Sequence, residues 1–181
     1  MKSPQTIGFI GVGVMGEPIC RHLAQKSGVR VLVNDRSEEP LQRLAAFGAQ
    51  AVSREQIAQQ ADVIFMSLPS GEVVEQVVLG EGGLLQSGHG GQIIVDLSTS
   101  AVSITRRIAA ALAEAGMPFA DAPVMRTRAA AEAGTLAVPV GADDEIFALI
   151  QPYIAMFAAD VVHAGGIGAG QVVKILNNMV L

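Results

Sequence analysis

Short apolar runs alternate along the chain with longer segments in which apolar and polar residues follow a helical period. Runs such as 63–67 are apolar on both faces, which is typical of strands in a parallel sheet covered by helices on each side. The alternation therefore predicts an open α/β fold, doubly wound around a mostly parallel sheet. Strands are expected over 6–10, 29–33, 63–67, 92–96, 117–121, 136–140 and 160–163, and helices over 15–26, 38–47, 72–79, 101–115 and 145–157.

Composition narrows the functional class. With 181 residues, 50% of them hydrophobic, the chain can bury the core of one domain. A net charge of −5 disfavours nucleic acid and anionic membranes as partners, and no apolar run approaches the roughly 18 residues of a membrane span. One cysteine and three scattered histidines offer no metal-ligand spacing, so no metal is expected. Because glycines interrupt the first apolar run, we interpret it as a strand of a cytoplasmic protein and not as a secretory signal.

Residues 11–16 read Gly-Val-Gly-Val-Met-Gly and fit the pattern G-x-G-x-x-G between a predicted strand and a predicted helix. Gly11 permits a tight turn, Gly13 lets the backbone approach a pyrophosphate, and Gly16 lets helix and strand pack closely. The helix N-terminus then offers free N–H groups to the phosphates. The motif indicates a Rossmann-type dinucleotide-binding domain, with Val14 and Met15 also beside the cofactor. A glycine-rich turn without a ligand is the alternative.

The end of the second predicted strand carries a further cofactor signal. Asp35 follows the last glycine of the motif by about 20 residues, the spacing at which an acidic residue binds the ribose hydroxyls of NAD. Arg36 comes next and could instead meet the 2′-phosphate of NADP, but Asp35 would repel that phosphate. The pair therefore favours NAD over NADP, and a turn-initiating aspartate is the simpler alternative.

Four blocks of sequence, in order along the chain, resemble the β-hydroxyacid dehydrogenases, a family that includes 3-hydroxyisobutyrate dehydrogenase, tartronate semialdehyde reductase and, more distantly, 6-phosphogluconate dehydrogenase. Residues 7–18 resemble the opening of these enzymes, and Leu68-Pro69 resembles their Leu-Pro after the fourth strand. Residues 121–124 with 134–136 resemble their substrate-binding segment, and 168–178 resemble their catalytic segment, G-x-G-x-x-x-K-x-x-N-N. The resemblance implies an oxidoreductase that transfers a hydride between NAD(P) and a small anionic β-hydroxyacid or its semialdehyde. It also implies that three residues at strand ends line the cofactor: Leu68, Pro69 and Thr99.

By this resemblance Lys174 is the catalytic lysine. It lies on a predicted helix that is otherwise apolar, and it could exchange a proton with the substrate oxygen as a general acid/base. Asn178 is four residues further on and shares a helix face with Lys174, so its amide could hold the same oxygen. Asn177 lies on a different face of the helix and is the weaker candidate for holding the substrate oxygen. A lysine that faces solvent on an amphipathic helix is the alternative.

One segment departs from the family pattern. Where the family reads Ser-Gly-Gly, the chain has Met125, Arg126 and Thr127. Thr127 still offers a hydroxyl to the substrate, and Arg126 adds a planar, permanently charged donor. We therefore expect a substrate with a strong or additional anionic group: a sulfonate, a phosphate or a second carboxylate. The alternative is that Arg126, or Arg128 nearby, faces solvent.

In the family, the lysine-bearing helix continues into an all-helical domain that closes the substrate cleft and usually makes the dimer. We therefore expect an NAD(P)-binding domain over 1–166 and the start of an inter-domain helix over 167–181, with the helical domain absent from this chain. The parent protein is then expected to be a homodimer or homotetramer. Two other functions stay open: a non-catalytic dinucleotide-binding or protein-interaction module, and an imine-reducing relative, a class that generally lacks the lysine.

Overall fold

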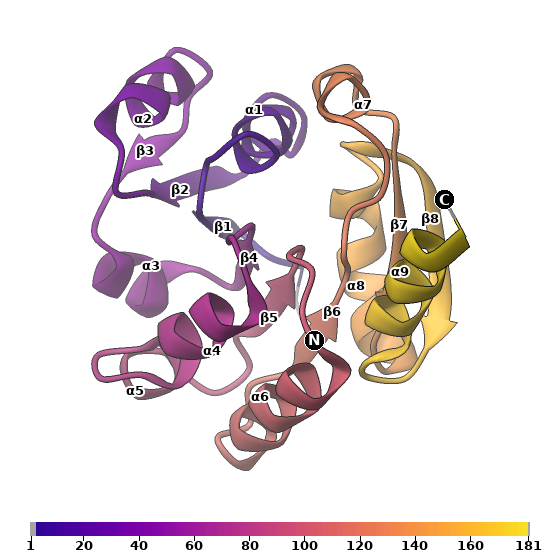
Figure 1. The fold of residues 1–181 in the computed structure, drawn as a ribbon. Coiled ribbons are helices and arrows are strands. Elements are labelled where there is room, and N and C mark those ends of the chain that lie inside the picture. Colours follow the sequence, from indigo (N-terminus) through magenta and orange to yellow (C-terminus); the bar gives the residue numbers. More distant parts are fainter. Residues whose placement is uncertain (1–2, 181) are drawn as a thin grey trace.

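One sheet organises residues 3–180, the part of the chain that the computed structural model describes (Figure 1). Its eight strands are β1 (Thr6–Ile10), β2 (Arg30–Asn34), β3 (Gln50–Ala51), β4 (Val63–Met66), β5 (Ile93–Asp96), β6 (Phe119–Asp121), β7 (Leu136–Gly141) and β8 (Ala158–Gly165). The strand order is β3-β2-β1-β4-β5-β6-β7-β8. Neighbouring strands are parallel except β6 and β7, which are antiparallel and meet at the single pair Asp121 and Gly141.

The chain changes its direction across the sheet between β1 and β4. From β1 it proceeds through β2 to β3 at one edge, and it then returns to β4 on the other side of β1. In open α/β sheets, ligands bind at such a switch point, outside the carboxyl ends of the strands. The predicted fold class, a doubly wound and mostly parallel sheet with helices on both faces, is confirmed.

Helices cover both faces of the sheet. They are α1 (Gly16–Lys26), α2 (Glu38–Ala45), α3 (Arg54–Gln60), α4 (Gly71–Leu79), α5 (Leu84–Ser87), α6 (Val102–Glu114), α7 (Arg128–Ala133), α8 (Asp144–Ile154) and α9 (Ala169–Val180). Successive strand residues point to opposite faces, so Phe65 of β4 joins a core with α1, α2, α7 and α8, whereas Ile64 joins a core with α3 to α6. The last helix, α9, packs against β7 and β8 (Figure 1). Within residues 3–180, none of these helices is both long and apolar enough to cross a membrane.

Four short elements lie outside the sequence predictions: β3, α3, α5 and α7. The clearest omission is α3, which begins with a capping box. The Ser53 hydroxyl accepts a hydrogen bond from the Gln56 N–H (3.1 Å), and the Gln56 side chain accepts one from the Ser53 N–H (3.0 Å). The sequence pattern Ser-x-x-Gln was therefore a usable signal for this helix.

The predicted C-terminal end of the helix over 145–157 is wrong. The observed α8 stops at Ile154, and the N–H groups of Met156 and Phe157 bond to carbonyls three residues back. This tighter turn reverses the chain into β8, which runs over 158–165 and is longer than the predicted strand over 160–163.

Candidate functional site

The glycine turn between β1 and α1 has the geometry that a dinucleotide requires. Gly11 has φ +91°, and a Cβ there would overlap the Ser67 carbonyl oxygen. A Cβ at Gly16 would overlap the Gly11 carbonyl oxygen, so helix and strand are as close as their backbones permit. A Cβ at Gly13 would meet nothing within 4 Å, so this part of the backbone is open to a ligand. The turn at Gly11 and the close contact at Gly16 are therefore as expected, and the role of Gly13 at a pyrophosphate stays a prediction.

A cleft of about 690 Å³ lies at the switch point, outside the ends of β1, β2 and β4. Its walls come from the glycine turn, the end of β2 and the segment after β4. The lining includes every residue predicted to bind the cofactor except Thr99, namely Gly11, Gly13, Val14, Met15, Gly16, Asp35, Arg36, Leu68 and Pro69. Thr99 is exposed on the loop after β5, beyond this cleft.

Asp35 ties the end of β2 to the glycine turn. Its carboxylate accepts hydrogen bonds from the Val12 N–H (2.7 Å) and the Ser37 N–H (2.8 Å). Each oxygen keeps a lone pair for a ligand hydroxyl. Arg36 and Arg54 line the same cleft. Arg54 was missed at the sequence level because it opens α3, the helix that was not predicted.

The segment predicted to bind substrate follows β6. Met125 exchanges backbone hydrogen bonds with Ala137 of β7, and Thr127 is the N-cap of α7, with its hydroxyl accepting from the Ala130 N–H (3.4 Å). Arg126 has φ +85°, a left-handed conformation that favours glycine. The arginine thus occupies a glycine-type backbone position, where the resembling family has glycine.

The guanidinium of Arg126 is held by two partners. It donates to the Thr135 carbonyl oxygen and pairs with the carboxylate of Asp160 on β8. Both side chains of the ion pair are about half exposed, with relative accessibilities of 45% and 57%. Arg126 therefore neither projects freely into solvent nor lies buried, and its remaining N–H groups stay available for an anion.

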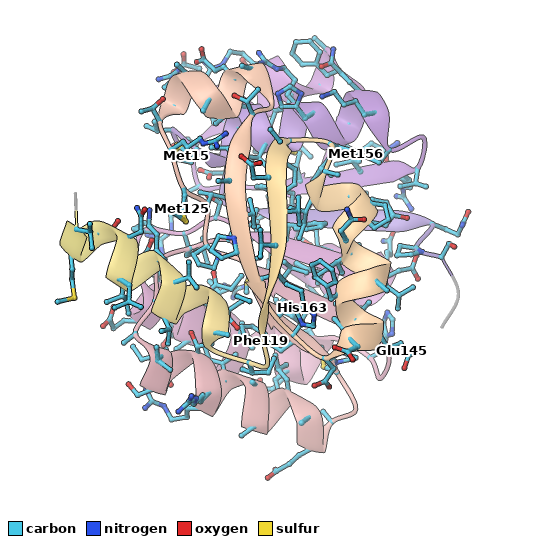
Figure 2. All side chains as sticks on the ribbon, turned by 90° about the vertical axis from the view of Figure 1, so that its right-hand side faces the viewer. Met15, Phe119, Met125, Glu145, Met156 and His163 are labelled. Atoms are coloured by element: carbon cyan, nitrogen blue, oxygen red, sulfur yellow. The ribbon has the colours of Figure 1, made fainter. Side chains whose placement is uncertain are left out.

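The helix that carries Lys174 starts at the carboxyl end of β6. Asp121 is the last residue of this strand, and its carboxylate accepts from the N–H groups of Gly168 (2.6 Å) and Gln171 (2.9 Å). Lys174 and Asn177 are half-buried, whereas Asn178 is exposed. Met125 pairs with Ala137 of β7, the strand against which α9 packs, and Figure 2 labels Met15 and Met125 on the side of the view where α9 lies. The glycine turn follows the carboxyl end of β1, and the segment of Met125 and the start of α9 both lie at the carboxyl end of β6.

Two aspartates lie buried at the carboxyl ends of the strands. Asp96 and Asp121 end the neighbouring strands β5 and β6 and are paired in register. Burial raises the pKa of Asp96 to about 6, although hydrogen bonds from Ser98 and Ser100 oppose the shift. Burial also raises the pKa of Asp121, against hydrogen bonds from the backbone at the start of α9. No described residues form a group of histidines, cysteines or carboxylates that could hold a metal ion.

The family model of the NAD binding domain of 6-phosphogluconate dehydrogenase matches residues 6–166. The chain belongs to this family. It is 42% identical to 2-(hydroxymethyl)glutarate dehydrogenase of Eubacterium barkeri, over 100% of the chain and 60% of that protein. It is 41% identical to 3-hydroxyisobutyrate dehydrogenase of Pseudomonas aeruginosa, over 97% of the chain and 59% of that protein. The solved structure of Psf3 in complex with NADP+ and 2-OPP superposes with a TM-score of 0.89 at 35% identity, over 96% of the chain and 62% of that structure. The chain thus spans about 60% of the length of its relatives.

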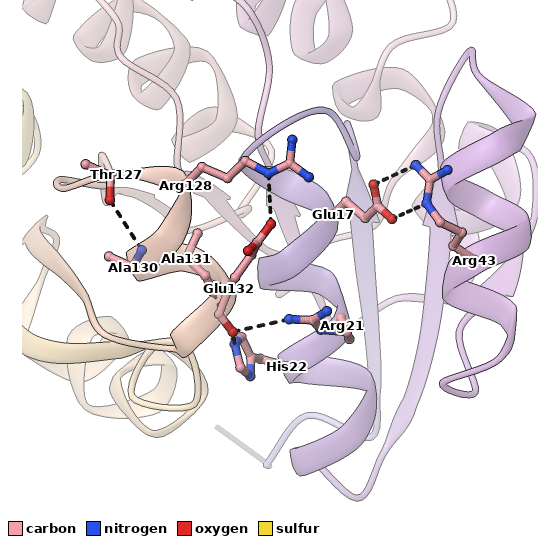
Figure 3. A network of polar contacts seen from close by, with 9 residues as sticks. All are labelled: Glu17, Arg21, His22, Arg43, Thr127, Arg128, Ala130, Ala131 and Glu132. Atoms are coloured by element: carbon pink, nitrogen blue, oxygen red, sulfur yellow. Dashed lines mark hydrogen bonds and ion pairs between the residues drawn. The ribbon is translucent and has the colours of Figure 1, made fainter.

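This NAD-binding domain has a second hollow, of about 380 Å³, between α1, α2 and α7 (Figure 3). Ion pairs line it: Arg43 with Glu17, and Arg128 with Glu132. The Arg43 guanidinium holds the pKa of Glu17 below its usual range. Arg128, two residues after Arg126, lines this hollow. Because both arginines are paired with carboxylates of the same hollow, we interpret the hollow as an ion-paired junction between helices.

Proposed function

We propose that this NAD-binding domain serves a dehydrogenase that moves a hydride between NAD and a small anionic β-hydroxyacid or its semialdehyde. One observation carries the proposal: Asp121, the last residue of β6, accepts hydrogen bonds from the N–H groups of Gly168 and Gln171, which fixes the first turn of α9, three residues before Lys174, at the carboxyl ends of the strands. Ligands of open α/β sheets bind at this edge. The names of the two relatives described above, a hydroxymethylglutarate dehydrogenase and a hydroxyisobutyrate dehydrogenase, support the same reaction class.

The chemistry divides between cofactor and chain. The nicotinamide, when bound, accepts the hydride from the carbinol carbon or returns it. In the oxidative direction, the Lys174 amine takes the hydroxyl proton while the C–H bond is lost and the carbonyl forms; in the reductive direction its ammonium gives that proton back. Asn178, one helical turn further on, holds the substrate oxygen. Asn177 is the second candidate, since it is the more buried of the two amides.

We further propose NAD as the preferred cofactor. Asp35 is fixed by two backbone N–H groups at the end of β2, where its free lone pairs can accept from ribose hydroxyls. A 2′-phosphate there would meet this carboxylate. Arg36 and Arg54 supply the opposing argument for NADP, because both line the cleft and could bind the phosphate. The cofactor in the Psf3 structure makes this alternative a specific one to test.

For the substrate, we propose a second anionic group that Arg126 recognises. Arg126 lies two residues before α7, and its guanidinium is bound to Thr135 and Asp160 with further N–H groups left for a ligand. The relative that names 2-(hydroxymethyl)glutarate supports a second carboxylate, because a glutarate has two.

We propose that the parent protein covers the outer face of α9. Leu176 and Met179 of this helix have relative accessibilities of 56% and 77%. Large apolar side chains in a row usually mark a contact surface. A following helical domain, which the relatives' extra length can accommodate, would bury them and join the subunits of a homodimer or homotetramer.

The proposal is tested by replacing the lysine in the complete gene product. Wild-type enzyme should reduce NAD+ with at least one of 3-hydroxyisobutyrate, glycerate, 3-hydroxypropionate, 4-hydroxybutyrate, 2-(hydroxymethyl)glutarate or a sulfonated diol. Lys174→Ala should lower kcat by about 10²- to 10⁴-fold, the contribution of a general acid/base, with NAD+ affinity unchanged by calorimetry. A wild-type enzyme inactive on the whole panel, or a fully active Lys174→Ala variant, would refute the assignment.

A further inference from the structure

Gln171 is a polar side chain with no exposed surface, on the first turn of α9. Its Nε2 donates to the Ser98 carbonyl oxygen (2.8 Å), and its Oε1 accepts from the Ser100 N–H (3.0 Å). A carbonyl can only accept and an N–H can only donate, so these two partners fix the orientation of the amide. The side chain therefore joins α9 to the loop that follows β5.

That loop is itself connected to the cofactor cleft. The Ser98 hydroxyl accepts from the N–H of Leu68, which lines the cleft (2.9 Å). The Asp96 carboxylate holds the loop from below, by accepting from the Ser98 N–H (2.8 Å) and the Ser100 hydroxyl (3.0 Å). A continuous chain of hydrogen bonds thus runs from α9 through residues 98–100 to the cofactor side of the crevice.

The position of Gln171 on its helix aligns it with the proposed catalytic groups. Lys174 is three residues beyond Gln171 and Asn178 is seven beyond it, so all three share one stripe of α9. Gly170, the preceding residue, seats the helix on the sheet: a Cβ there would lie 2.6 Å from the Asp121 carbonyl oxygen and 2.7 Å from that of Pro139. The amide of Gln171 therefore fixes the rotation of α9 about its own axis, and with it the direction of Lys174.

We propose that Gln171 is a positioning residue, which sets the distance and angle between Lys174 and the cofactor by anchoring α9 to the loop over residues 98–100. This role rests on the proposed function, in which Lys174 handles the proton. Hydride and proton transfer need near-attack geometry, and misplacement by about 1 Å costs on the order of 10²-fold in rate. Gln171 itself, being buried at the start of α9, has no contact with the reacting atoms in this scheme.

A second buried glutamine offers a matched control. Gln92 has no exposed surface either, and its Nε2 donates to the carbonyl oxygens of Ala58 (2.9 Å) and Ala61 (2.6 Å), on the α3 side of the sheet. Methionine is close to glutamine in shape and makes none of these bonds. Gln171→Met and Gln92→Met should therefore lower the melting temperature in a similar way, and only the first disturbs α9.

The experiment compares these variants in the complete gene product, with NAD+ and the panel hydroxyacid that wild type oxidises fastest. Gln171→Met should lower kcat about tenfold to a hundredfold, leave the Kd for NAD+ within about twofold, and raise the primary deuterium isotope effect at the carbinol carbon. Gln92→Met should change neither kcat nor the isotope effect. Equal kcat and isotope effects in the two variants would overturn the proposal while Lys174→Ala still upheld the proposed function. Wild type inactive on the whole panel would refute both.

A conservative variant keeps the test decisive if Gln171→Met does not fold. The protonated carboxyl of Gln171→Glu can still donate to Ser98 and accept from Ser100. When it ionises, it loses that donor, and it adds a negative charge to a region that already holds Asp121, which is bonded to the backbone N–H of residue 171, and Asp96, which is bonded to Ser100. Its kcat should be within about threefold of the wild-type value at low pH. As the pH rises, its kcat should fall by a larger factor than the kcat of wild type does, while the circular dichroism spectrum stays constant. A pH profile parallel to that of wild type would refute the positioning role.

Discussion

The close contacts of the glycine turn between β1 and α1 are made by backbone atoms, those of Gly11 with Gly16 and with Ser67, whereas the start of α9 is held by hydrogen bonds that involve side chains and span 47, 50 and 71 positions. In the turn, backbone meets backbone, and side chains matter mainly by their absence at Gly11 and Gly16. At α9, buried side chains such as Gln171 make the hydrogen bonds that hold the helix in place. The glycine turn therefore depends on the absence of side chains, and the anchoring of α9 depends on their presence.

The largest effect in this comparison is expected within the turn itself. Gly16→Ala should destabilise the domain by roughly 3 kcal/mol and abolish NAD+ binding, because its Cβ would overlap the Gly11 carbonyl oxygen. Gly13→Ala should leave the melting temperature unchanged, since its Cβ enters open space, and yet weaken NAD+ binding by occupying room the pyrophosphate needs. Thermal melts and calorimetry would separate the two. Equal loss of stability in both variants would contradict the role given to the close backbone contact at Gly16.

A smaller effect is expected at the end of β2. Asp35→Ala removes charge-assisted hydrogen bonds to the ribose, so the Kd for NAD+ should rise about tenfold to a hundredfold. The Kd for NADP+ should stay level or fall, because the repulsion of its 2′-phosphate is lost while Arg36 and Arg54 remain. Titrations with both cofactors measure the change. Unchanged NAD+ affinity would refute the role of Asp35.

On the substrate side, two arginines close in sequence should differ. Arg126→Ala should raise KM for a dianionic substrate about tenfold and barely change KM for a singly charged hydroxyacid. Arg128→Ala is the matched control, since this residue pairs with Glu132 in the hollow beside α1. Steady-state kinetics with 2-(hydroxymethyl)glutarate and 3-hydroxyisobutyrate would decide. A KM increase of the same size for both substrates would exclude recognition of a second anion by Arg126.

The smallest effect concerns pH and the buried network under α9. Because burial raises the pKa of Asp96 to about 6, the folded chain binds this proton more tightly than the unfolded chain does. The stability it contributes is present below about pH 4 and is lost as the pH rises through about 6. Asp96→Asn should therefore show a smaller fall in melting temperature between pH 4 and 6.5 than wild type. The exposed Asp143→Asn is the control, and its melting profile should parallel that of wild type.

The contrast between the two regions also explains what could be predicted from sequence. The tight turn at Gly11 and the close contact at Gly16 could be predicted from the spacing of the motif, and the doubly wound fold could be predicted from the alternation of strands and helices. Arg54 was missed with its helix, although Ser53 and Gln56 gave a local signal. The anchoring of α9 could not have been foreseen, because nothing near Gln171 in sequence indicates that Ser98 and Ser100 lie beside it. Long-range hydrogen bonds leave no periodic trace in the chain.

If Arg126 binds the substrate as proposed, its backbone conformation suggests how such a fold could acquire a new substrate. Its φ of +85° means that the loop follows the path it would take with glycine, so arginine is accommodated without redirecting the chain. The ion pair with Asp160 is exposed and stabilises the loop by no more than about 1 kcal/mol, comparable to the strain of a left-handed arginine. Glycine and arginine codons differ by one nucleotide. A single point mutation at this position could thus exchange an open loop for a fixed positive charge, and substrate preference could diverge between genes while the scaffold is inherited unchanged.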